Sequence, residues 1–188
     1  MIGSVIFNLL IAVCTAVSVW LDIKKAGAKY LMRFFTIQSN LLCAFAALLV
    51  LIFRLAGPVP NGVLVFKHIG TVAAAVTLLV VLFYLAPAAE NYFSLFHGTN
   101  LFLHLLCPLL AIVSLILWDR PKGGFGIVLL GLLPVAVYGA LYMYKVLKAP
   151  EGERWDDFYG FTAGGKWWLS FIAVGLVAFL ASLAFRLG

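Results

Sequence analysis

The sequence predicts an all-α, polytopic membrane protein with six transmembrane helices in a single domain, residues 1–188. Three observations lead to this fold class. First, 65% of the 188 residues are hydrophobic and 11% are charged, whereas a soluble domain is about 45–50% apolar and about 25% charged. Second, the apolar residues number about 122, and six spans of about 20 residues need about that many. Third, backbone groups in lipid must be satisfied internally, so each span is a helix.

The same composition excludes a soluble enzyme, a nucleic-acid-binding module and a disordered chain, because so few charges cannot cover a soluble globule. The net charge is +6, but the basic residues lie between apolar runs and form no basic arm. We therefore expect no nucleic acid as a partner. Cys14, Cys43 and Cys107 all lie inside apolar runs without CxxC spacing, which indicates no disulfide and no zinc site. We expect no cofactor.

Six apolar segments are each close to the length that crosses a hydrocarbon core about 30 Å thick. They cover about residues 2–21, 35–56, 69–87, 98–118, 125–146 and 167–186. The first is interpreted as a retained helix, because no basic stretch precedes it and it is long for a signal peptide. The second follows a short basic loop. The third follows GPVPNGVLVFKH, whose Pro and Gly residues are typical of a turn, so His68 is expected in an interfacial loop.

Prolines predict interruptions in the fourth and fifth segments. Pro108 lacks an N–H, so the carbonyl of His104 should lose its helical partner and the helix should bend there. Pro134 has the same expected effect on the carbonyl of Leu130. The sixth segment follows the longest polar stretch, LKAPEGERWDDFYGFTAGGK, which holds four of the seven acidic residues. We expect Asp156 and Asp157 to be solvated.

The distribution of Lys and Arg predicts the orientation. Eight of them flank the odd-numbered loops and five flank the opposite side, and no charged side chain precedes the first helix. The positive-inside rule then puts the odd-numbered loops in the cytoplasm and both termini outside.

Polar residues within the second segment form one stripe. Thr36, Ser39, Asn40 and Cys43 follow the spacing i, i+3, i+4, i+7, which places them on one helix face. A polar stripe in a membrane helix must face protein or water rather than lipid.

A second stripe runs along the fourth segment through His97, Asn100 and His104. Both segments begin on the same side of the membrane, so Thr36 and His104 are expected in one leaflet at comparable depth. Most other polar residues gather at that end. The polar residues of the opposite end are thinly spread, which indicates plain anchorage: Asn8, Arg54, His68 and Asp119.

The stretch RFFTIQSN at residues 33–40, with Asn100, His104 and Pro108, resembles the androgen-induced protein family, which includes the androgen-dependent TFPI-regulating protein and small bacterial six-helix relatives. The resemblance implies a multi-pass hydrolase, here in a bacterial inner membrane, that cleaves fatty acid esters of hydroxy fatty acids. Thr36 matches the family nucleophile and His104 its histidine. The fifth loop departs from the Tyr-Pro-rich stretch expected before the last helix of the family.

The implied chemistry is acyl transfer to a hydroxyl, which needs a base at hydrogen-bond distance. His104 is the expected base for Thr36, and His97 is its rival. No intramembrane acid is available to orient the imidazole, so we expect a dyad. A metal site of the two histidines and an acid is a weaker alternative. Three amides are candidates to orient the ring or to donate to the oxyanion: Asn40, Asn100 and Gln38.

The expected substrate is a membrane lipid with an acyl ester. Candidate substrate contacts are Arg33, Ser39, His97, Tyr138 and Tyr142. The competing hypothesis is a non-catalytic protein that binds or transports a lipid or a small molecule. A transporter should have a polar path through both leaflets, whereas the polarity here is expected in one. Assembly as a homodimer stays open.

Overall fold

The computed structural model describes residues 2–187, and every regular element in this range is helical. Six helices are long and apolar enough to cross a membrane, which confirms the all-α, polytopic fold class. They span Ile2–Ala26, Phe35–Ala56, Asn61–Ala88, Thr99–Leu117, Gly126–Leu147 and Trp167–Leu187. These six helices make the chain an integral, multi-pass membrane protein.

Three of the spans are single helices and three are interrupted. The uninterrupted helices are α1 (Ile2–Ala26), α3 (Phe35–Ala56) and α10 (Trp167–Leu187). The third span comprises α4 (Asn61–Val80), a π-helical turn η1 (Val81–Leu85) and α5 (Ala86–Ala88). The fourth comprises α6 (Thr99–Leu101), a second π-helical turn η3 (Phe102–Leu106) and α7 (Cys107–Leu117). The fifth comprises α8 (Gly126–Gly131) and α9 (Leu133–Leu147).

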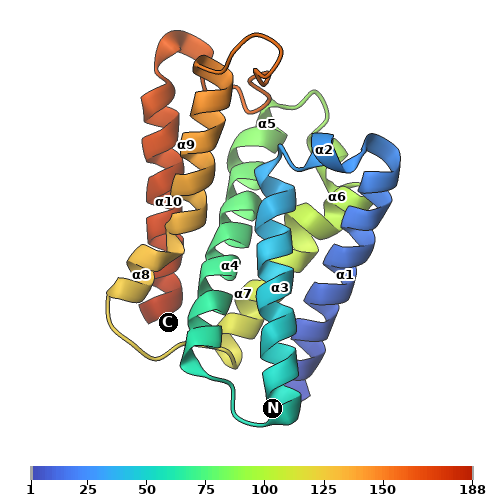
Figure 1. The fold of residues 1–188 in the computed structure, drawn as a ribbon, viewed down its shortest axis with the longest axis vertical. Helices are drawn as coiled ribbons and strands as arrows, with labels where there is room; N and C mark the ends of the chain where they lie inside the picture. The colour runs from blue at the N-terminus through green and yellow to red at the C-terminus, as the bar shows by residue number, and fades with distance from the viewer. Residues whose placement is uncertain (1, 188) are drawn as a thin grey trace.

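Short helices complete the fold in three of the loops. They are α2 (Ala28–Leu31) and the 3₁₀ turns η2 (Tyr92–Phe96) and η4 (Ala163–Gly165). Helix α4 is central: it contacts α3 and α7 on one side and α8, α9 and α10 on the other (Figure 1). Both ends of the chain lie at one end of the bundle, and α2, α5 and the loop before α10 lie at the other (Figure 1).

Small residues let the central helices approach closely. A Cβ atom at Gly70 would lie 2.9 Å from the Cα of Cys43, so α3 and α4 can meet only with glycine at this position. At nearly the same level, Ile11, Ala74 and Ala111 belong to one buried cluster with Cys43, which joins α1, α3, α4 and α7.

The third span begins earlier than the sequence predicts. Helix α4 starts at Asn61, directly after Pro60, rather than near residue 69. As a consequence His68 is buried within the bundle and not in an interfacial loop, and its neighbour Lys67 is also fully buried. Proline at the N-cap is compatible with a helix start, because the first N–H groups of a helix have no partner within it.

Pro108 and Pro134 interrupt their helices as predicted, and Pro87 interrupts the third span as well. The fifth span breaks at Leu132, two residues before Pro134. In η1 the N–H of Ala86 bonds the carbonyl of Val81, five residues earlier, just before Pro87. Each π-helical turn thus ends two residues before a proline, η1 before Pro87 and η3 before Pro108. At these positions the α-helical hydrogen-bond ladder lacks a donor, because proline has no N–H.

Candidate functional site

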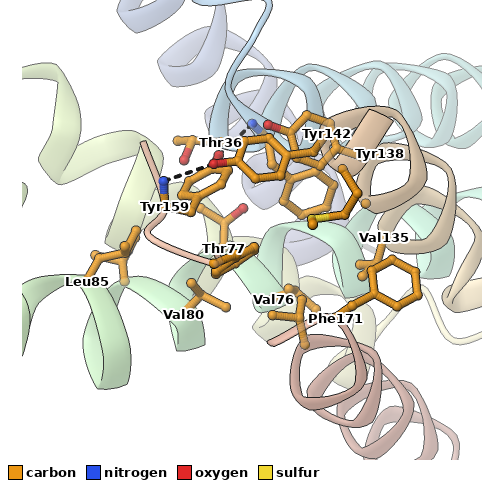
Figure 2. Close-up of a pocket in the computed structure, with 16 residues that line it drawn as sticks. Thr36, Val76, Thr77, Val80, Leu85, Val135, Tyr138, Tyr142, Tyr159 and Phe171 are labelled. Atoms are coloured by element: carbon orange, nitrogen blue, oxygen red, sulfur yellow. Dashed lines mark hydrogen bonds between the residues drawn. The ribbon is translucent and has the colours of Figure 1, made fainter. Parts of the chain in front are cut away.

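Thr36 lies at the start of α3, where Phe34 is the N-cap in an extended conformation. No side chain caps this end, and the N–H of Phe35 donates to the hydroxyl of Tyr159 at 2.9 Å (Figure 2). The carbonyl of Thr36 accepts from Asn40 Nδ2 at 2.8 Å. Its hydroxyl has no hydrogen-bond partner among residues 2–187. Thr36 is the second residue of α3, so no earlier turn of this helix supplies an i−4 carbonyl, and the hydroxyl stays available.

His104 lies in η3 and is 9% exposed. Its Nδ1 is 2.7 Å from the carbonyl oxygen of Leu95, which lies in η2. A carbonyl can only accept, so Nδ1 carries the hydrogen. In the neutral ring Nε2 then has the free lone pair, which is the state that a general base requires.

The π-helical turn around the histidine follows from Pro108. The N–H of Cys107 bonds the carbonyl of Phe102, five residues earlier. In this register the carbonyl of Leu103 would pair with the N–H that Pro108 lacks. Asn40 Nδ2 on α3 donates to that carbonyl at 2.8 Å. The acceptor that the proline frees is therefore one residue earlier than the sequence predicts, and α3 satisfies it.

Thr36 and His104 line one cavity of about 670 Å³. Asn100 of α6 and Asp22 of α1 line it as well, and the remaining walls are mostly apolar. No hydrogen bond joins the Thr36 hydroxyl to the His104 ring among the residues described. The structure thus brings hydroxyl, imidazole, amide and carboxylate to one space, of a size usual for small-ligand sites.

A second, smaller cavity of about 60 Å³ adjoins the first (Figure 2). The two share Thr36, Leu85 and Tyr159, so Tyr159 stands where they meet. Apart from Thr36, Thr77 and three tyrosines, the second cavity is lined by apolar residues of α3, α4, η1, α9, α10 and the loop before α10. It includes Val135 and Phe171 (Figure 2).

Tyr138 and Tyr142, which the sequence suggests as substrate contacts, line this second cavity. The Tyr138 hydroxyl donates to the carbonyl of Arg33 at 2.6 Å, and the Tyr142 hydroxyl donates to Asp157 Oδ1 at 2.7 Å. Their hydrogens are therefore engaged within the protein, and the rings serve as walls.

The three candidate amides differ in what remains free. Asn40 donates one N–H to the carbonyl of Thr36 and one to that of Leu103, so it has none for an oxyanion. Gln38 donates to the carbonyl of Met32 at the surface and does not line the cavity. Asn100 lines the cavity, and its side chain has no hydrogen-bond partner within residues 2–187.

The other predicted contacts lie outside the cavity with the histidine. Ser39 is buried and its hydroxyl pairs with that of Thr77 at 2.8 Å. His97 is exposed and does not line the cavity, which leaves His104 as the histidine beside Thr36. The Arg33 guanidinium lies over the Tyr30 ring and lines neither cavity.

The loop before α10 folds into the bundle at Asp157, which is only partly exposed, whereas Asp156 is exposed as predicted. The carboxylate of Asp157 accepts from the Tyr142 hydroxyl, from the N–H of Phe161, and from both the N–H and the hydroxyl of Thr162. Burial opposes ionisation of Asp157, but these hydrogen bonds outweigh it and hold its pKa below the ordinary value. This anchorage places Tyr159 against the N-terminus of α3.

Polar residues at the opposite end are not thinly spread, and three of the four predicted there, Asn8, Arg54 and Asp119, form one network. The buried carboxylate of Asp119 accepts from Ser4 at 2.7 Å, Asn8 at 2.7 Å and Ser114 at 2.6 Å, and pairs with Arg54 at 3.0 Å. Burial disfavours the charge, but these four donors hold the pKa of Asp119 below its usual value. The residues come from α1, α3, α7 and the turn after α7, so only the fold reveals the cluster.

A second hydroxyl–imidazole pair lies near that end. His68 Nε2 is 2.8 Å from Ser182 Oγ, and both residues are buried. The single hydroxyl hydrogen of Ser182 goes to the carbonyl of Val128 at 3.0 Å. His68 must therefore donate to Ser182 from Nε2 and is no base for this serine. The pair joins α4, α8 and α10.

Two further observations bear on the chemistry. Among residues 2–187, no group of three or more His, Cys, Asp or Glu side chains is placed to hold a metal ion. Comparisons with protein-family models, curated proteins and solved structures find no match.

Proposed function

We propose that the protein is an intramembrane hydrolase of lipid acyl esters, with Thr36 as nucleophile and His104 as general base. The observation that supports this most is the shared cavity: a hydroxyl without a partner and an imidazole with free Nε2 both line it. A threonine hydroxyl becomes nucleophilic when an adjacent base takes its proton. The resemblance to the androgen-induced protein family favours fatty acid esters of hydroxy fatty acids as substrates.

The reaction begins when the proton of the Thr36 hydroxyl moves to His104 Nε2 and the oxygen attacks the ester carbonyl. The developing oxyanion needs donors. Asn100 has an unengaged amide at the cavity, and the N-terminus of α3 provides a positive dipole end next to Thr36. His104 then passes its proton to the leaving alcohol, and water releases the acid from the acyl-threonine in the reverse sense.

Access from the lipid is supported by a third, laterally placed hollow of about 510 Å³. It lies between α4, η1 and α10 and shares Val80, Phe161 and Val174 with the apolar cavity next to Thr36. Its walls include Phe83 and Leu169, which are exposed on the surface of the bundle. An acyl chain could enter here without crossing the aqueous phase, as suits a substrate dissolved in the bilayer.

The test uses the full chain in nanodiscs with a p-nitrophenyl acyl ester. Thr36→Ala and His104→Gln should each lower kcat by about 1,000-fold, a size usual for members of a nucleophile–base pair. Thr36→Ser should keep measurable activity, and His97→Gln should match the parent. If folded Thr36→Ala protein hydrolyses the ester at the parent rate, the proposal is wrong.

One observation favours the alternative, a binding or transport protein. Lys67 is fully buried near the opposite end and its Nζ has no hydrogen-bond partner in the described part of the chain. With Asp119 it makes that leaflet polar too, and intramembrane ionisable residues often mark transport paths. Assays in proteoliposomes separate the two functions. A transporter should move solute in the Thr36→Ala variant as well as in the parent, whereas a hydrolase should lose its ester hydrolysis in Thr36→Ala.

A further inference from the structure

The expected dyad lacks an acid next to the histidine, and Asp22 is an acid that lines the cavity of Thr36 and His104. It lies near the end of α1, and its Oδ1 accepts from the Thr99 hydroxyl at 2.7 Å. Thr99 begins α6, the short helix that leads directly into the turn bearing His104. The bond therefore ties the carboxylate to the element that carries the imidazole, and Oδ2 keeps free acceptor positions.

His104 needs a counter-charge when it takes the threonine proton. Its Nδ1 is held by the Leu95 carbonyl, which fixes the tautomer but carries no full charge. An imidazolium in surroundings of low dielectric is costly without an anion nearby. In Ser-His-Asp enzymes a carboxylate stays ionised and stabilises the imidazolium.

Asp22 carries the one carboxyl group among the described residues that line the cavity, and carboxyl side chains are ordinarily anions at neutral pH. The other titratable groups there are His104 itself and the phenols of Tyr84 and Tyr159. Phenols ionise near pH 10, and burial raises the pKa of Tyr159 to about 12. No Lys or Arg lines this cavity.

The elements that contact η3 bring no rival charge among the described residues. On α1, Lys24 and Lys25 are exposed, and Lys24 Nζ lies 3.8 Å from the centre of the Trp20 ring. His97, between η2 and α6, is exposed as well. The remaining titratable groups on these elements are thiols, an exposed phenol, or groups nearer the opposite end: Cys14, Cys43, Cys107, Tyr92, Arg54, Lys67 and His68.

We propose that Asp22 is a positioning residue that stabilises the protonated form of His104, so that the site works as a Thr36–His104–Asp22 unit. This inference rests on the proposed hydrolase function. The proton moves from Thr36 Oγ1 to His104 Nε2 and then to the leaving alcohol oxygen, while the Thr36 oxygen–acyl bond forms and the ester bond breaks. Asp22 stays ionised throughout and takes no proton.

The kinetic test is Asp22→Asn, which removes the charge but keeps an acceptor for Thr99. We expect kcat to fall by about 10-fold or more with little change in KM. The acid limb of the pH–rate profile should move to lower pH, because an imidazole without a neighbouring anion gives up its proton more readily. Asp22→Glu and Thr99→Val retain the charge and should keep the acid limb where the parent has it. A parent-like kcat and acid limb in Asp22→Asn would overturn the proposal.

A second measurement needs no turnover. Proton NMR in nanodiscs follows the ring resonances of His104, which are assigned by their loss in His104→Gln. These resonances should titrate at lower pH in Asp22→Asn than in the parent. If Thr36→Ala stays active but the titration shifts, the hydrolase proposal fails and the coupling of Asp22 to His104 stands. If activity needs Thr36 and His104 but the titration does not shift, the coupling is the part that fails.

Discussion

Two hydroxyl–imidazole centres lie at different levels of the same helix bundle, and they differ in what their atoms have left to do. At Ser182 and His68, the serine hydrogen goes to a backbone carbonyl and the histidine donates to the serine oxygen. Among residues 2–187, the Thr36 hydroxyl has no hydrogen-bond partner and the His104 ring is held only through Nδ1. The first pair is buried, and the second lines a cavity of about 670 Å³.

Because the two centres differ in their free atoms, proximity of serine or threonine to histidine does not by itself indicate catalysis. A saturated pair stabilises the contact between helices, because each polar group in lipid must be paired. A reactive pair needs a free lone pair on the base and space for a substrate. In the network around Asp119 the carboxylate is saturated, since four donors from three helices surround it, while Asn8 Oδ1 and Arg54 Nε have no partner within residues 2–187.

The largest expected effect on stability comes from breaking that network. Asp119→Ala leaves Arg54 without its carboxylate and three polar side chains without their acceptor, so the free energy of unfolding should fall by about 3–5 kcal/mol. Unfolding in mixed micelles measures it, with the exposed Asp156→Ala as matched control. The surviving folded protein should hydrolyse ester at the parent rate per molecule. A loss below about 1 kcal/mol would show that the network adds little.

The same network predicts a pH dependence. The folded protein holds the pKa of Asp119 below its ordinary value, so its contribution to stability is present above the unfolded-state pKa of about 3.9 and is lost as pH falls through the lower folded value. Part of the acid destabilisation of the parent should therefore be missing in Asp119→Asn. Unfolding curves between pH 3 and pH 7 check this, and equal slopes in both proteins would contradict it.

A smaller loss is expected at the saturated hydroxyl–imidazole pair. Ser182→Ala leaves His68 Nε2 buried without an acceptor, which should cost about 1–3 kcal/mol. The double variant His68→Leu and Ser182→Ala should recover part of this, because neither partner then remains unpaired. Both proteins should keep the parent rate of hydrolysis. A loss of rate greater than the loss of folded protein would mean that this pair takes part in the reaction.

The smallest effect is expected at His97, the rival base. Its side chain is exposed and lines neither cavity next to Thr36. His97→Gln should therefore change the free energy of unfolding by less than about 0.5 kcal/mol and leave kcat unchanged. A loss of kcat comparable to that of His104→Gln would reassign the base.

The fold class follows from the sequence because apolar length and composition are local properties. The stripe that begins at Thr36 was also predictable, since helical periodicity fixes which residues share a face, but His97 of the second stripe precedes α6 and is exposed. Asp22 could not be predicted as a site residue, because its side chain reaches the cavity only when α1 packs beside η3. The cluster around Asp119 needed the same long-range information, and a π-helical register changed which carbonyl Pro108 leaves free.

Covalent labelling directly tests the proposal that Thr36 is the nucleophile and His104 is its base. A fluorophosphonate probe with an alkyl chain is applied to the parent and variants in nanodiscs, and the labelled peptide is identified by mass spectrometry. We expect a label on Thr36 in the parent and in His97→Gln, and none in Thr36→Ala or His104→Gln. Equal labelling of Thr36→Ala and the parent, or a label on another residue, would contradict it.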